Sequence, residues 1–140
     1  MTLREYIEAQ VASGRFFPDG EQLDYFVKGY CIALLWASIY HDQDRETFLD
    51  ENHCIDDISS RSMKIIRNEC QMFMNHAHDT LDNGDLEQHG HDFFMTRQGH
   101  GVGFYDRDLP KDKAKTLDRI ARGFREQYIY AHNGKVEVEL

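Results

Sequence analysis

The spacing of hydrophobic residues predicts that the first half of the chain is helical. Apolar residues recur at helical spacing over residues 3–14, which indicates a short first helix. A longer and more strongly apolar pattern over residues 21–40 predicts a second helix that is buried on most of its circumference. Asp19 precedes this helix as a suitable N-cap, and Gln22 completes a capping box. We therefore expect residues 21–40 to form the central helix of the fold.

A third helix is predicted to start at Ser59 or Ser60, which can cap it, and to end at Asn83-Gly84. Its inward-facing residues follow helical spacing and are Met63, Ile66, Cys70, Phe73 and Ala77. Residues 41–57, between the second and third helices, show no sustained hydrophobic period. They predict an acidic loop.

The pattern changes after the third helix. The segments DFFMTR (92–97) and VGFYD (102–106) are short and rich in aromatic residues, which predicts two strands joined by a glycine-rich turn. A fourth helix is predicted after Pro110. At the end of the chain, Asn133-Gly134 is typical of a type I′ turn, and hydrophobic residues alternate with glutamates after it.

Together these elements predict an α+β fold, with three N-terminal helices followed by a ββαββ unit that has a small antiparallel sheet. The chain has 140 residues, which is close to the commonest size of one domain. We expect a single domain over residues 1–140, with a helical part over 1–84 and the ββαββ part over 85–140.

Charge is distributed unevenly along the chain. The net charge is −9, from 25 acidic and 16 basic residues, which argues against a protein that binds nucleic acid directly. Residues 42–57 hold seven acids and one base, whereas residues 107–125 hold seven bases and three acids. The acidic segment is a candidate binding face formed by Asp42, Asp44, Glu46, Asp50, Glu51, Asp56 and Asp57.

Two interpretations of the charged segments remain open. Spaced carboxylates can imitate a phosphate backbone and occupy a nucleic-acid-binding site on a partner, but they can also belong to a solvated loop. The basic residues of the fourth predicted helix can face solvent or pair with the acidic end of a second copy, which makes a homodimer possible.

Several classes of protein are disfavoured by the sequence. Three cysteines without CxxC spacing argue against a disulfide framework and against a cysteine zinc site. The N-terminus has no apolar stretch typical of a signal peptide, and the longest apolar run, residues 30–40, is too short for a membrane span. We therefore expect a cytoplasmic protein that does not insert into membranes.

Histidines between residues 89 and 100 are candidate metal ligands. If residues 89–91 form a strand, His89 and His91 face the same side and could chelate Zn²⁺ or Mn²⁺, with His100 in the adjoining turn. Alternatively, the histidines hydrogen-bond backbone groups in a turn. On this second interpretation no cofactor is required.

The same region holds the densest set of candidate catalytic or binding side chains in the chain. They are Asp92, Arg97, His100, Tyr105, Asp106 and Arg107. A histidine with an aspartate and an arginine can support phosphodiester or acyl chemistry, although no nucleophile elbow is present. The alternative is that the aspartates and arginines brace each other and the turn. The glycines of the stretch GHGVG, residues 99–103, fit roles in backbone conformation better than a role in a phosphate-binding loop. We expect Gly99 and Gly101 to have positive φ.

The segment GHDFFMTRQGHGVGFYDRDL, residues 90–109, resembles a signature found in small uncharacterised bacteriophage and prophage proteins, of the form GHDFW-L-T-R-N-G-H-G-A-G-F-W-D-R. The phrase YFVKGYCIALLWAS, residues 25–38, also resembles the N-terminal half of that family. The resemblance implies an accessory protein of a phage or mobile element that acts in the cytoplasm of a bacterial host. It implies no activity.

Three hypotheses follow. The first is a non-enzymatic accessory protein that binds a host protein or complex through its acidic face, as a nucleic-acid mimic or an inhibitor of host defence. The second is a metal-dependent hydrolase or nuclease that uses His89, His91 and His100. The third is a binder of a small ligand such as a signalling nucleotide, which Arg97, Tyr105 and Arg107 would contact.

Overall fold

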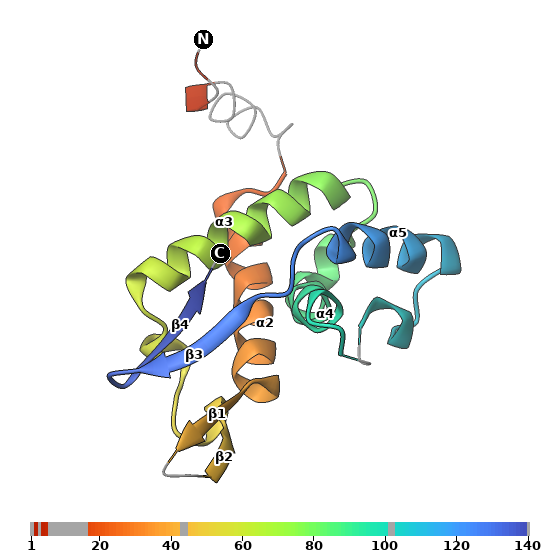
Figure 1. The fold of residues 1–140 in the computed structure, drawn as a ribbon. Coiled ribbons are helices and arrows are strands. Elements are labelled where there is room, and N and C mark those ends of the chain that lie inside the picture. The colour runs from red at the N-terminus through yellow and green to blue at the C-terminus, as the bar shows by residue number, and fades with distance from the viewer. Residues whose placement is uncertain (1, 3, 6–16, 43–44, 101–102, 140) are drawn as a thin grey trace.

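Helix α2 (Gly20–Ala37) runs through the middle of the protein (Figure 1). This computed structural model describes residues 2, 4–5, 17–42, 45–100 and 103–139. The predicted capping box at the start of α2 is confirmed. The backbone N–H of Gln22 donates to Asp19 Oδ1 at 2.8 Å, and the backbone N–H of Asp19 donates to Gln22 Oε1 at 2.9 Å. Most of the helix predicted over residues 3–14 lies outside the described residues.

The helices that follow are α3 (Ser60–Ala77), α4 (Leu86–Arg97) and α5 (Lys111–Arg122). Helices α3 and α4 pack against α2, whereas α5 packs against α3 and α4. The prediction that Ser59 caps α3 is confirmed, because its side chain accepts from the backbone N–H of Ser62 at 3.1 Å. The helix ends at Ala77, earlier than predicted. Residues Asn83–Asp85 instead form a short 3-10 turn that leads into α4.

Stacked aromatic rings form the centre of the core between these helices. The rings of Phe73 on α3 and Phe93 on α4 stack with their centroids 4.3 Å apart, and Phe26 on α2 lies against both. Phe104, which follows α4, also stacks with Phe73, with the ring centroids 5.9 Å apart. All four of these side chains are fully buried. Their burial ties α2, α3 and α4 into one packed unit.

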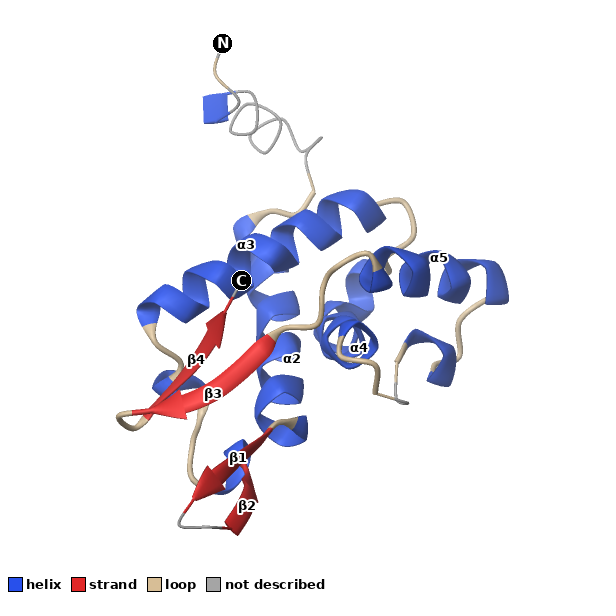
Figure 2. Ribbon diagram, viewed as in Figure 1, coloured by secondary structure: helices blue, strands red, loops and turns tan. Residues whose placement is uncertain are grey.

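The strands form two separate two-stranded antiparallel sheets (Figure 2). Strands β3 (Tyr128–His132) and β4 (Lys135–Glu139) make the predicted C-terminal hairpin. Asn133 and Gly134 in its turn have φ of 52° and 74°, as a type I′ turn requires.

Strand β1 (Ile39–Asp42) begins within the helix predicted over residues 21–40, which ends at Ala37, and β2 (Arg45–Phe48) lies in the segment that we predicted to be a loop. Two 3-10 turns, Leu49–Glu51 and Ile55–Asp57, follow β2. The hairpin projects away from the helices at one end of the molecule (Figure 1).

The prediction of strands at residues 92–97 and 102–106 is wrong. Residues 92–97 belong to α4, and Phe104–Asp106 form a 3-10 turn. Every residue from Asp92 to Arg97 is buried, so the helix shows no polar face that would reveal its period. The α+β class is correct, but the ββαββ order and the single sheet are not.

Two glycines allow α4 to cross α2 at very short range. A Cβ atom at Gly29 would lie 1.7 Å from the carbonyl oxygen of Glu87, and one at Gly90 would lie 1.9 Å from the carbonyl oxygen of Phe26. Each glycine therefore accommodates the backbone of the opposite helix. The crossing packs α4, from the predicted C-terminal part, directly against α2, from the predicted helical part.

Among the described residues, no helix is both long enough and apolar enough to cross a bilayer.

Candidate functional site

Asp92 and Arg107, two of the candidate catalytic residues, form a partly buried ion pair. Asp92 is fully buried on α4 and accepts hydrogen bonds from Arg107 Nε at 3.0 Å and Nη2 at 2.9 Å. Gln88, one turn earlier on α4, donates to the same carboxylate at 3.0 Å. Burial by itself raises the pKa of Asp92, but the contacts with His91, Arg107 and Gln88 outweigh it and hold the pKa below its usual value. The pair fastens the segment after α4 to the helix.

Asp106 stabilises the backbone of the same segment. Its Oδ2 accepts from the backbone N–H of Gly103 at 3.0 Å and so closes the 3-10 turn Phe104–Asp106. The expectation that the aspartates and arginines of this region brace each other and a turn therefore describes Asp92, Asp106 and Arg107, although the turn is not part of a hairpin.

Arg97 lies in a second, more deeply buried cluster. Its side chain forms an ion pair with Glu69 on α3 and donates to the hydroxyl of Tyr30 on α2 at 3.2 Å. Its Nε donates to the backbone carbonyl of Arg125 at 3.0 Å. The guanidinium carbon is 5.5 Å from the ring centroids of both Phe93 and Phe124, a cation–π distance. Arg97 thus joins α2, α3 and α4 to the segment before β3.

Two glutamines complete this cluster. The side-chain amide of Gln98 pairs reciprocally with the backbone of Gln127, at 2.6 and 2.9 Å, and the Gln127 side chain accepts from the Tyr30 hydroxyl at 2.5 Å. The sequence did not point to Glu69, Tyr30 or Gln127, because each lies in a segment that was assigned only from the spacing of its apolar residues. No local spacing links them to Arg97.

The three histidines of the predicted metal site lie in different environments. His89 and His91 are on a helix, where residues two apart point roughly 200° away from each other, so the same-face arrangement expected of a strand is wrong. His89 is buried and its Nε2 accepts from the backbone N–H of Asp82 at 3.2 Å, whereas the His91 ring lies 5.9 Å from that of Trp36. His100 is exposed beyond the helix end. Within the described ranges, no three His, Cys, Asp or Glu side chains are placed to hold a metal ion.

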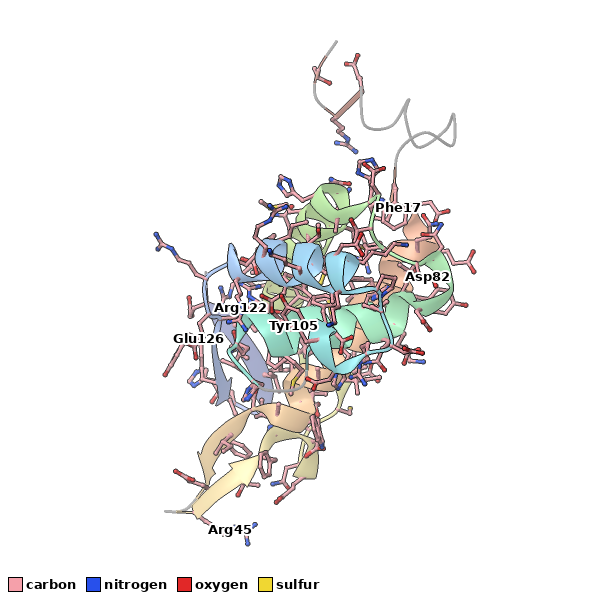
Figure 3. The ribbon with its side chains drawn as sticks, turned by 90° about the vertical axis from the view of Figure 1, so that its right-hand side faces the viewer. Phe17, Arg45, Asp82, Tyr105, Arg122 and Glu126 are labelled. Atoms are coloured by element: carbon pink, nitrogen blue, oxygen red, sulfur yellow. The ribbon has the colours of Figure 1, made fainter. Side chains whose placement is uncertain are left out.

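Tyr105 differs from the other candidates in this region because it points into solvent. Its side chain is 59% exposed beside α5, as Figure 3 shows. The structure does not place Arg97 or Arg107 beside it as free cations, since each is engaged in the ion pairs described above. Arg97, Tyr105 and Arg107, which were expected to contact a small ligand together, are therefore not available as such a site.

The acidic segment forms the end of the molecule that carries β1 and β2. Four of its carboxylates, those of Glu46, Asp50, Glu51 and Asp56, are exposed. Asp57 instead accepts from the backbone N–H of Cys54 at 2.9 Å, which is the main cause of its lowered pKa. The side chain of Asp42 and the whole of Asp44 lie outside the described residues.

A hydrophobic pair lies among these carboxylates. Ile39 and Phe48 are direct cross-strand partners, and they are 50% and 45% exposed. Thr47 and Leu49, the neighbours of Phe48 in sequence, are buried, so Phe48 and Glu46 share the outward face of β2. We call this surface, made of Ile39, Phe48, Glu46, Asp50, Glu51 and Asp56, the acidic end.

Comparison with known proteins adds no relative to this description. No family model, curated protein or solved structure matches the chain. The function must therefore be inferred from the surfaces themselves. Asp92, Arg97, Asp106 and Arg107 hold the fold together, while the acidic end leaves both apolar and charged groups open to solvent.

The buried position of His89 predicts a pH-dependent stability. Burial lowers the pKa of His89, against the opposing effect of Asp92, Asp85 and Asp82. The unfolded chain has a histidine pKa of about 6.5 and takes up a proton that the folded state resists. The contribution of His89 to the free energy of unfolding is therefore complete above that pH, and it is lost as the pH falls towards the lower pKa of the folded state. We expect the melting temperature to fall between about pH 7.5 and pH 5.5, and His89→Gln, which keeps an acceptor for Asp82, to reduce that fall. An equal fall in both proteins would contradict this role.

Proposed function

We propose that this protein is a non-enzymatic binding module that docks on a host protein through the acidic end. The observation that carries the proposal is the exposed Ile39–Phe48 pair, in the same part of the chain as the exposed carboxylates of Glu46, Asp50, Glu51 and Asp56. Protein-binding surfaces typically combine an apolar centre with a polar rim. An apolar pair directly opposite across two strands, with both side chains about half exposed, gains stability when a partner covers it.

The charge of the acidic end indicates the chemistry of the partner. Within the described part of the chain, no cation lies within ion-pair distance of Glu46, Asp50 or Asp56, and Glu51 has only the exposed Arg45, at 3.7 Å. These carboxylates are therefore available to meet cations on another molecule. Such complementary charge accelerates encounter and selects partners more than it adds affinity.

We infer that the partner presents a cationic surface of the kind that binds nucleic acid. Carboxylates spaced over a hairpin and two turns offer the same charge as a phosphate backbone, and they would compete with nucleic acid for such a surface. The resemblance of residues 90–109 to phage and prophage proteins supports a bacterial protein as the target. On this proposal the protein acts by occupying the nucleic-acid-binding surface of its partner. The catalytic hypotheses are set aside because Asp92, Arg97 and Arg107 form ion pairs within the fold.

Neutralising the acidic end should weaken binding without unfolding the protein. The variant Glu46→Gln/Asp50→Asn/Glu51→Gln/Asp56→Asn is expected to weaken binding to a partner isolated from a bacterial host by about tenfold or more, because several charge-assisted contacts are lost. Its melting temperature should stay near that of the wild type, since all four side chains are exposed and exposed pairs contribute little to stability.

A matched control separates local charge from net charge. The variant Asp79→Asn/Asp85→Asn/Asp108→Asn/Asp112→Asn also removes four exposed carboxylates, all outside the acidic end, and should bind like the wild type. The variant Ile39→Thr/Phe48→Thr keeps residues suited to strands and should bind weakly. Equal binding by the wild type and the acidic-end variants would refute the proposal.

A further inference from the structure

A cleft beside α5, away from the acidic end, combines an aromatic ring with positive charge. The cleft has a volume of about 500 Å³ and is lined by Tyr105, Lys115, Thr116, Asp118, Arg119, Arg122 and Gly123. In Figure 3, Tyr105 and Arg122 face the viewer beside α5, and Arg45 marks the far end of the β1–β2 hairpin. This cleft is independent of the acidic end and of the function proposed for it.

The cations of the cleft form one stripe along α5. Lys115, Arg119 and Arg122 are spaced i, i+4 and i+7, so they lie on the same face of the helix, and all three are exposed. Arg122 forms an ion pair with Asp118 at 2.9 Å, whereas no carboxylate in the described ranges lies within ion-pair distance of Lys115 or Arg119. In a chain with a net charge of −9, this exposed cationic stripe is suited to an anionic ligand.

The aromatic ring adds a second requirement to the ligand. Tyr105 is 59% exposed and is held at the end of the cleft by the 3-10 turn that Asp106 closes. An exposed aromatic ring beside cations is the combination that binds a nucleobase by stacking and its phosphates by charge. The volume of the cleft lies within the usual range for small-molecule sites.

We propose that this cleft binds a nucleotide, with its phosphates on Lys115, Arg119 and Arg122 and its base against Tyr105. The shared chemistry, a base joined to phosphate, is present both in free nucleotides and in an unpaired strand. The protein as a whole repels a polyanion, which favours the free nucleotide. The site differs from the ligand site expected from sequence, since it keeps Tyr105 but replaces Arg97 and Arg107 by the cations of α5.

Isothermal titration of the full-length protein with ATP tests the proposal, with inorganic pyrophosphate and a short oligothymidylate as comparison probes. We expect saturable binding of ATP with a Kd below about 1 mM at low salt. Arg119→Gln should weaken ATP binding about tenfold, because it removes a charge-assisted contact to phosphate. Lys113→Gln, an exposed cation of α5 that does not line the cleft, should change it less than about twofold.

The comparison probes and a ring variant separate the outcomes. Tyr105→Leu should weaken ATP binding and leave pyrophosphate binding unchanged, since only the base contacts the ring. Tighter binding of ATP than of oligothymidylate supports a free nucleotide, and the reverse order identifies an unpaired strand as the source of the same chemistry. No saturable binding of ATP, or equal losses in Arg119→Gln and Lys113→Gln, would overturn the proposal, as would equal affinities for ATP and pyrophosphate.

Discussion

Replacing Arg97 by methionine is expected to lower the free energy of unfolding by about 3–5 kcal/mol, the range found when one partner of a buried ion pair is removed. Methionine preserves much of the side-chain volume between Phe93 and Phe124, so the loss is mainly electrostatic. The substitution leaves the carboxylate of Glu69 without its partner and the carbonyl of Arg125 without a donor. Urea unfolding followed by circular dichroism measures the change.

A double-mutant cycle shows whether the loss comes from the Arg97–Glu69 pair. Glu69→Gln keeps the shape of the side chain and removes its charge, so the double variant Glu69→Gln/Arg97→Met should lose less than the two single variants together. Strict additivity would mean that the two charges do not interact, and the loss would then come from the other contacts of Arg97, with Tyr30, the Arg125 carbonyl and the two aromatic rings.

Placing a methyl group at the α2–α4 crossing should disrupt the fold even more directly. Gly29→Ala and Gly90→Ala each put a Cβ atom less than 2 Å from a backbone carbonyl oxygen of the opposite helix. Backbone atoms cannot rotate away as a side chain can, so the helices must separate. We expect each variant to lose about 3 kcal/mol or more, at or beyond the upper end of the usual cost of overpacking. The measurement is again the free energy of unfolding.

Gly20 provides the control for these glycine variants. It is the first residue of α2, and a Cβ atom there would have no neighbour within 4 Å. Gly20→Ala should therefore be neutral or stabilise the protein by up to about 1 kcal/mol through the better helix propensity of alanine. If all three glycine variants behave alike, the crossing is looser than described.

Helix starts and turns that are determined by local hydrogen-bonding residues could be predicted from the sequence. Asp19 with Gln22, Ser59, and Asn133-Gly134 each fix a helix start or a turn within a few residues, and all three predictions are confirmed. Such signals depend only on neighbouring residues, so tertiary contacts did not override them here.

Elements defined by tertiary contacts could not be predicted. Helix α4 is buried along most of its length, and Gly90, within it, is required by the crossing with α2. The same limit applies to the candidate site. The Asp92–Arg107 pair was within reach because both residues belong to one dense polar segment, whereas the partner of Arg97 is Glu69, on another helix. The apolar pair at the acidic end was missed because the β1–β2 hairpin itself was missed.

The most direct test of the proposed function is photocrosslinking from the acidic end inside a bacterial host. A photoreactive phenylalanine analogue in place of Phe48 should give a covalent adduct of one defined mass, and neutralising Glu46, Asp50, Glu51 and Asp56 in the same chain should remove it. The same analogue at Tyr105, beside α5 and away from the acidic end, serves as the control and should give no adduct with that partner. Adducts from position 105 with none from position 48 would contradict a binding surface at the acidic end.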